Sequence, residues 1–363
     1  MVRALLTAVT TAVVAAGGVV GVPGVAAADE VRDAQWQLAA LDASAAWADA
    51  TGAGVVVAVV DSGVDATHPD LAGQVLPGLD LVDGSTDGRV DPVGHGTSVA
   101  ALIAGRGDDG AGVVGLAYQA RILPIRVLDS GNEYHDAMVV ARAVQWAVDQ
   151  GAGVINLSLG GPAYSPALAD ALDYAFARNV VVVACTGNVL PASSAEVWYP
   201  AREPGVVAVA GLGGDPDTQP DPLWASSLTG SSTVLAAPAA DLLTARPGGG
   251  YWRVMGTSFA APLVSATAAL IRARWPRMSA ANVVQHLTAT ARDLGPAGRD
   301  DRYGFGMVNP VAALRTKVLD VPTNPLDTAP PPGVAGFGPA AAAEHGAQPA
   351  RPLRNHPLWP VKV

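Results

Sequence analysis

One serine in this chain has the local sequence of a catalytic nucleophile. Ser258 follows a Gly-Thr pair and opens a run of small and apolar residues, ending near Arg274, that predicts a buried helix. A serine at a helix start lies near free backbone N–H groups and the positive end of the helix dipole. Such groups stabilise an anion, so the position suits a nucleophile whose attack generates an oxyanion. That chemistry is acyl transfer, and it also needs a base, a carboxylate and a further hydrogen-bond donor.

Three residues elsewhere in the chain have the types that these roles require. Asp61 ends a β-branched run, His95 lies between two glycines at the start of an apolar helix, and Asn188 follows a buried strand. In this hypothesis Ser258 attacks, and His95 takes and returns its proton. Asp61 orients the imidazole, while Asn188 and the Ser258 backbone N–H bind the oxyanion. Taken singly, each partner is more often structural: a turn-forming Asp, a packed His or a turn Asn.

Strands and helices alternate along the chain in a pattern typical of an α/β fold. Runs rich in β-branched and other apolar residues predict strands buried on both faces at Val55–Val60, Ile122–Leu128, Val154–Leu159, Val180–Ala184 and Val206–Ala210. Helical patterns cover Thr97–Ala104, Ala137–Val148, Pro166–Ala177, Ser258–Arg274, Ala280–Arg292 and Val311–Lys317. Right-handed crossovers between such strands give a mostly parallel central sheet covered on both faces, which is a three-layer α/β/α arrangement. Ligands bind at the carboxyl ends of these strands, where Asp61 and Asn188 lie.

Composition excludes some classes of function. The 363 residues carry a formal net charge of -10, which argues against nucleic acid as a partner because phosphate binding needs a basic face. Cys185 is the single cysteine, so no intrachain disulfide can form. Its apolar context favours a packed small side chain over a reactive thiol.

The chain divides into four segments by composition. Residues 1–28 have a positive start, an apolar run and small residues before Asp29, which predicts a secretory signal peptide and a secreted or envelope-associated protein. The alternative is an uncleaved membrane anchor, which the glycines and Pro23 in the run disfavour. Residues 29–54 form a lead-in too short to bury a core of its own. The catalytic domain spans 55–317, and the Pro- and Ala-rich tail, 318–363, is expected to be disordered and has no run long enough to cross a bilayer.

Five motifs, in this chain order, resemble those of the subtilisin-like serine proteases, or subtilases. They are Asp61-Ser-Gly, Gly94-His-Gly-Thr-Ser-Val-Ala, Ser158-Leu-Gly-Gly, Thr186-Gly-Asn and Gly256-Thr-Ser-Phe-Ala-Ala-Pro. The order Asp, His, Ser is the one known for subtilisin. The residues around Gln35 and Trp47, the short lead-in and the Pro-rich tail look most like the mycosins, subtilases of actinobacterial type VII secretion. Mycosins usually carry a transmembrane helix after the Pro-rich segment and commonly have disulfide-forming cysteines. This sequence departs from that pattern in both respects, since no such helix is expected after its Pro-rich segment and Cys185 is its single cysteine.

The resemblance implies where a protein or peptide substrate binds. The segment Ser158, Leu159, Gly160 and Gly161 would pair with the extended substrate and, with residues 184–188, would wall the pocket for the residue before the cut. Subtilases usually have a glycine at the pocket floor, and Trp198 stands there in this sequence. We therefore expect a shallow apolar pocket that prefers Ala or a similarly small residue. Alternatively, Trp198 turns into the core and leaves the pocket open.

The resemblance also raises the question of calcium. Asp70, Asp108 and Asp109 match positions that hold calcium in many subtilases. The loop from Gly105 to Gly112 is one residue longer than the usual binding loop and contains a positive charge at Arg106. We therefore favour solvated carboxylates, with no cofactor required and calcium as the alternative.

Two other functions compete with proteolysis. One is a scaffold role in a type VII secretion complex, in which proteolysis is secondary. The other is a lipase-type acyl hydrolase, which is disfavoured because the chain lacks a Gly-x-Ser-x-Gly elbow and has the wrong triad order.

Overall fold

The computed structural model describes residues 30–107, 110–134, 136–189 and 196–327. Within these ranges one large sheet has the strand order β2-β3-β1-β4-β5-β6-β7, and every neighbouring pair is parallel. Its strands are β1 (Val56–Asp61), β2 (Leu79–Asp80), β3 (Arg121–Arg126), β4 (Val154–Leu157), β5 (Val181–Cys185), β6 (Val207–Leu212) and β7 (Leu235–Pro238). The predicted α/β fold with a mostly parallel sheet is confirmed.

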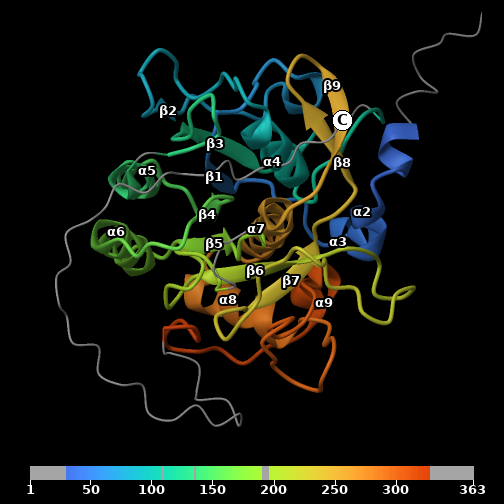
Figure 1. The fold of residues 1–363 in the computed structure, drawn as a ribbon. Coiled ribbons are helices and arrows are strands. Elements are labelled where there is room, and N and C mark those ends of the chain that lie inside the picture. Colours follow the sequence, from blue (N-terminus) through green and yellow to red (C-terminus); the bar gives the residue numbers. More distant parts are fainter. Residues whose placement is uncertain (1–29, 108–109, 135, 190–195, 328–363) are drawn as a thin grey trace, which may run out of the picture.

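Helices cover both faces of this sheet (Figure 1). On one face lie α5 (Ala137–Asp149) and α6 (Pro166–Ala177), which pack against each other. On the other lie α4 (His95–Ala104) and α7 (Thr257–Arg274), with α8 (Ala280–Ala289) and α9 (Pro310–Arg315) packed against α7. A separate antiparallel hairpin, β8 (Leu242–Arg246) and β9 (Gly250–Val254), leads into α7.

Helix α7 is the central helix of the molecule. Every residue from Thr257 to Arg272 is buried, and the helix contacts β4, β5, β6 and β7 as well as α4. Its small side chains, mostly Ala, Ser and Thr, allow this close packing against the sheet. Because the helix is fixed on all sides, the position of Ser258 in its first turn is fixed too.

The predicted element ends differ from the observed ones by a few residues. The strand predicted to reach Leu128 ends at Arg126, because the N–H groups of Val127 and Leu128 both donate to the carbonyl of Asp61. The helix predicted to reach Arg292 ends at Ala289, since Arg292 instead exchanges backbone bonds with Met307.

The described part of the lead-in packs onto the catalytic domain through two short helices, α2 (Trp36–Ala40) and α3 (Ala43–Trp47). Gln35 is buried and exchanges two hydrogen bonds with the backbone of Val114, at 3.0 and 2.8 Å. The Trp36 indole donates to the carbonyl of Ala240. The lead-in therefore shares the domain's core, although it is too short to form one alone.

The predicted signal peptide and most of the predicted tail lie outside the described residues. Among the residues that are described, no helix has both the length and the apolar character needed to span a membrane.

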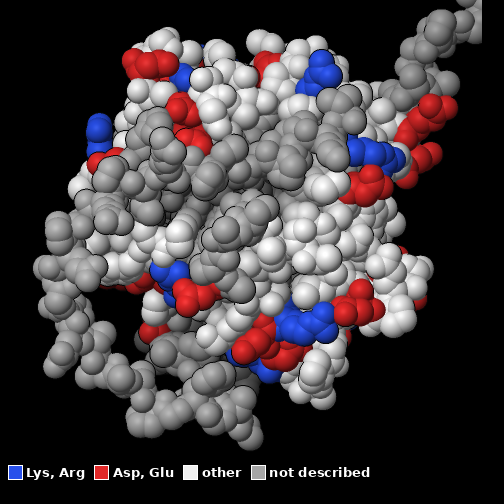
Figure 2. All heavy atoms as spheres, in the orientation of Figure 1, with Lys and Arg blue, Asp and Glu red and all other residues white. Residues whose placement is uncertain are grey.

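On the face shown in Figure 2, several basic side chains lie next to acidic ones. Surface pairs of this kind include Arg292 with Asp217 and Arg302 with Asp221.

Candidate active site

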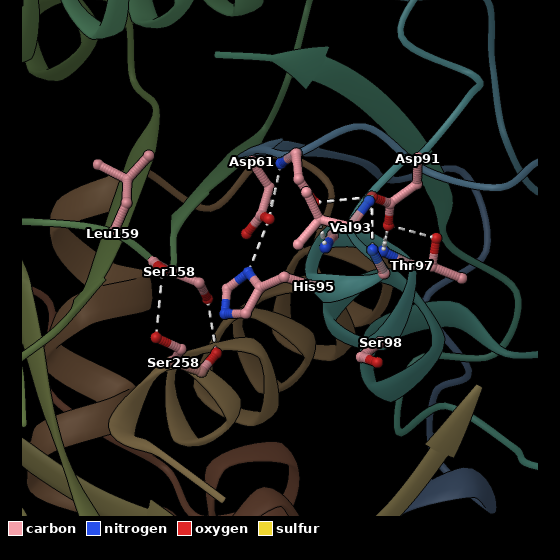
Figure 3. Close-up of polar contacts among 12 residues, drawn as sticks. Asp61, Asp91, Val93, His95, Thr97, Ser98, Ser158, Leu159 and Ser258 are labelled. Atoms are coloured by element: carbon pink, nitrogen blue, oxygen red, sulfur yellow. Dashed lines mark hydrogen bonds and ion pairs between the residues drawn. The ribbon is translucent and has the colours of Figure 1, made fainter. Parts of the chain in front are cut away.

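Asp61 and His95 meet at the carboxyl end of β1, an interior strand of the sheet. Asp61 is the last residue of β1 and His95 the first of α4, and His95 Nδ1 lies 2.7 Å from Asp61 Oδ1. Both side chains are buried. A carboxylate can only accept, so Nδ1 donates and Nε2 is the nitrogen that would exchange a proton with a nucleophile. Figure 3 shows the imidazole between the Asp61 carboxylate and Ser258.

The close approach of α4 to β1 requires a glycine after the histidine. A Cβ on Gly96 would lie 2.0 Å from the carbonyl oxygen of Gly63 and 3.1 Å from Asp61 Cβ. Any larger residue would push the start of α4 away from the strand end. The glycine beside His95 thus sets the distance of the hydrogen bond to Asp61.

Ser258 lies in the first turn of α7 and is tied to the end of β4 by a reciprocal pair of hydrogen bonds. Its Oγ donates to the carbonyl of Ser158 at 3.1 Å, and the Ser158 hydroxyl donates to the carbonyl of Ser258 at 2.6 Å (Figure 3). Asn156 Nδ2 donates to the Ser158 hydroxyl at 2.9 Å. The two bonds between Ser158 and Ser258 join the segment expected to bind substrate to the residue expected to attack it.

Cys185 lies beside Ser258, with its Sγ 3.8 Å from the seryl Oγ. Burial raises the pKa of the thiol to about 11. A thiol with so high a pKa carries almost no thiolate at neutral pH, so the expected packed, unreactive side chain fits this position.

Asn188 is oriented by the residue that precedes Ser258. Its Oδ1 accepts from the backbone N–H and the hydroxyl of Thr257, both at 3.0 Å. The Thr257 hydroxyl in turn accepts from the N–H of Gly187 at 3.1 Å. Because two donors hold the amide oxygen, the amide NH₂ is the group available to donate, as an oxyanion site requires.

Trp198 contacts both segments expected to form the substrate pocket. Its ring lies against Gly187, where an added Cβ would be 2.3 Å from Trp198 Cδ2, and its Cβ lies against Gly160. Next to it, Gly161 and Tyr199 exchange two backbone bonds at 2.9 and 2.8 Å. Only 4% of Trp198 is exposed, so the side chain is buried beside these two segments.

Asp70, one of the calcium candidates, is hydrogen-bonded to backbone groups of the candidate calcium-binding loop. Its carboxylate accepts from the N–H of Val113 at 2.8 Å, and its carbonyl accepts from the N–H of Arg106. The other two calcium candidates, Asp108 and Asp109, lie outside the described residues. Within the ranges that are described, no three His, Cys, Asp or Glu side chains gather as metal ligands would.

Sequence reasoning missed a buried carboxylate near the site, Asp91, whose hydrogen bonds reach both sides of the Asp61–His95 pair (Figure 3). The signal was an Asp four residues before His95, ahead of a glycine turn. Nothing in that pattern alone separates a turn-forming Asp from a buried one.

Comparison with known proteins gives consistent matches. The model of the Subtilase family matches residues 52–306. Subtilisin DY from Bacillus licheniformis is 37% identical over 268 residues, which are 73% of this chain and 92% of that protein. Fervidolysin from Fervidobacterium pennivorans is 35% identical over 316 residues, and the chain spans only 44% of its length.

Among solved structures, MycP1 with its N-terminal propeptide removed matches with a TM-score of 0.71 and 31% identity. The match covers 79% of this chain and 98% of the MycP1 chain. Another structure describes MycP1 as a serine protease and an essential component of the type VII (ESX-1) secretion system.

Proposed function

Because the chain belongs to the subtilase family of serine proteases, we propose that it is an exported endopeptidase acting through Asp61, His95 and Ser258. The observation that carries the proposal is the 2.7 Å hydrogen bond between His95 and Asp61, with Ser258 beside the imidazole. The apolar run and small residues of the first 28 residues support export.

The reaction proceeds in two halves. Ser258 Oγ attacks the carbonyl carbon of the scissile bond while its proton passes to His95 Nε2, and the imidazolium is stabilised by Asp61. His95 then gives the proton to the leaving amine, and an acyl-enzyme on Ser258 results. Water repeats the sequence, with His95 as base, and releases the acid. For the proton to reach His95, the seryl O–H turns from the Ser158 carbonyl, its partner at rest.

The oxyanion formed at each step is bound by Asn188 and the backbone N–H of Ser258. The two hydrogen bonds from Thr257 hold the Asn188 amide in place before substrate binds. Donors fixed in advance cost no reorganisation during the reaction, which is why they lower the barrier.

The residue before the cut is small and apolar in this proposal. The support is the contact of the Trp198 ring with Gly187 and of its Cβ with Gly160, because a bulky side chain beside these segments would leave little room for a large substrate residue. The neutral Val189 after Asn188 offers no attraction to a basic side chain.

A fluorophosphonate probe tests the nucleophile. The wild-type protein should be labelled, Ser258→Ala should lose the label and peptide hydrolysis, and the exposed-serine control Ser231→Ala should keep both. Undiminished labelling of Ser258→Ala would refute the assignment.

The second candidate is a scaffold role in a type VII secretion complex, which the similarity to MycP1 favours. Complementation of a deletion strain separates the two functions. Secretion restored by Ser258→Ala favours the scaffold, and secretion restored only by the wild type favours proteolysis.

A further inference from the structure

Asp91 is a buried carboxylate to which the proposed reaction gives no role. It lies in the loop before α4 and only 7% of it is exposed. Burial raises its pKa, and hydrogen bonds from Gly94 and Thr97 oppose that shift. An ionisable group held out of water beside a reactive centre needs a compensating function in structure or chemistry.

Five donors converge on this carboxylate (Figure 3). Oδ1 accepts from the hydroxyl of Ser62 at 2.9 Å and from the N–H groups of Val93 and Gly94 at 3.0 and 2.7 Å. Oδ2 accepts from the N–H and the hydroxyl of Thr97, at 2.9 and 2.6 Å. The hydroxyl of Thr97 also accepts from the backbone N–H of Asp65, so its proton is directed at Asp91. An ionised carboxylate satisfies this arrangement because it accepts at every lone pair.

These bonds cap the helix that carries His95. The formal N-cap, Gly94, has φ +100° and no side chain with which to cap α4. Asp91 takes over that role from three residues upstream, since it binds the N–H of Thr97 in the first helical turn. His95 is the first residue of that turn, so the direction of its side chain depends on the cap.

Ser62 connects the same carboxylate to Asp61. The Ser62 hydroxyl donates to Asp91 and accepts from the N–H of Gly96 at 3.0 Å. Its backbone N–H donates to Asp61 Oδ1 at 2.7 Å, the oxygen that also accepts from His95. The other oxygen, Asp61 Oδ2, is buried and has no hydrogen-bond partner among the described residues. The orientation of Asp61 therefore rests on Oδ1 and its two donors.

We propose that Asp91 is a positioning residue for the protease reaction: it holds the start of α4 and, through Ser62, the end of β1, so that His95 and Asp61 keep their hydrogen-bonded geometry. The inference rests on the proposed triad. A purely structural cap would affect stability alone, whereas a positioning residue also affects turnover per folded molecule.

The test compares Asp91→Asn with a cap variant away from the site, Asn309→Ala, whose wild-type side chain accepts from the N–H of Ala312 at the start of α9. In Asp91→Asn an amide NH₂ faces donors, so kcat should fall by about 10²-fold with KM within a factor of two, as for other small misplacements of reacting groups. Asn309→Ala should lower Tm by about 2–4 °C and leave kcat unchanged. Activity is measured well below each Tm and divided by the concentration of folded protein.

Two further measurements keep the test decisive if Asp91→Asn folds poorly. Ser62→Ala removes only the hydroxyl that donates to Asp91 and accepts from Gly96. It should therefore lower kcat by about tenfold, which is less than the loss expected for Asp91→Asn. The low-field proton resonance of the Asp61–His95 hydrogen bond should shift or broaden in both variants and not in Asn309→Ala.

The results separate this inference from the proposed function. If the wild type neither hydrolyses peptides nor is labelled at Ser258, the proposed function fails and the inference fails with it. If the wild type is active and both Asp91→Asn and Ser62→Ala keep its kcat and its low-field resonance, Asp91 is a structural cap and the inference alone is wrong.

Discussion

At the residue scale, the proposed preference for a small residue before the cut depends on Trp198. Its indole lies against Gly187 and its Cβ against Gly160, so it contacts both segments that would wall the substrate pocket. Trp198→Ala should open that space, so the ratio of kcat/KM for Phe over Ala before the cut should rise by about tenfold or more, on the order of what a few buried methylenes contribute. A peptide-library profile of both proteins measures this. A wild-type profile led by Phe, Leu or Lys would contradict the proposed preference for a small residue.

The residues of the candidate site are predictable because each lies at the end of a clear strand or helix pattern and the residue types together fit one reaction. Asp61 and Asn188 end or follow buried strands, and His95 and Ser258 begin apolar helices. Their mutual contacts are expected from the fold and the family resemblance, since parallel strands place their carboxyl ends at one edge. Asp91 is not predictable in this way, because an Asp ahead of a glycine turn is usually a turn former, and its contact with Ser62, 29 residues away in the sequence, forms only in the folded structure.

At the element scale, the lead-in is bonded to described residues of the loop that follows α4. The guanidinium of Arg32 donates to the carbonyl of Ala111 at 2.7 Å and to that of Gly112 at 3.3 Å, a position in which a cation compensates carbonyl dipoles. We therefore expect this side chain, and not calcium, to stabilise the loop. EDTA should change the Tm of the wild type by less than about 1 °C, while Arg32→Ala should lower it by about 2–4 °C.

Thermal scans with and without EDTA and added calcium measure both effects. Arg142→Ala, which removes an exposed arginine on α5, is the matched control and should leave Tm unchanged. A fall in the Tm of the wild type on chelation would show instead that calcium binds and stabilises the fold.

The elements that sequence reasoning predicts are those whose residues repeat a clear pattern. The continuous Val-rich runs of β1, β4 and β5 are almost wholly buried and are predicted to within two residues. Strand β7, at the edge of the sheet, has the sequence Leu-Ala-Ala-Pro. It is not predicted because it contains no β-branched residue and includes a proline, which argues against a strand. The hairpin β8–β9 has partly exposed strands without strict alternation, so its tertiary packing decides its structure.

At the scale of the whole molecule, the chain that follows α9 packs against the loop that precedes β6. Asn324 donates to the carbonyl of Gly205, and the N–H of Gly205 donates to the carbonyl of Leu326. Asp327 lies at the end of this contact, and the Asp173 carboxylate acts on both Asp327 and Glu203. The docking of residues 324–327 therefore gathers negative charge on a protein that is already acidic.

The resulting repulsion predicts a pH dependence of stability. Burial, then the Asp173 carboxylate, raises the pKa of Glu203 above its ordinary 4.5. A carboxyl whose pKa is higher in the folded chain stabilises the fold below its unfolded pKa, and this contribution is lost as pH rises through the folded pKa. Glu203→Gln, which is neutral at every pH, should therefore raise Tm by about 1–3 °C at pH 7 and leave it unchanged at about pH 4. Scanning calorimetry at both pH values measures the difference in Tm, with Glu30→Gln, at an exposed residue, as the control. An equal rise in Tm at both pH values would mean that the amide acts through packing and not through charge.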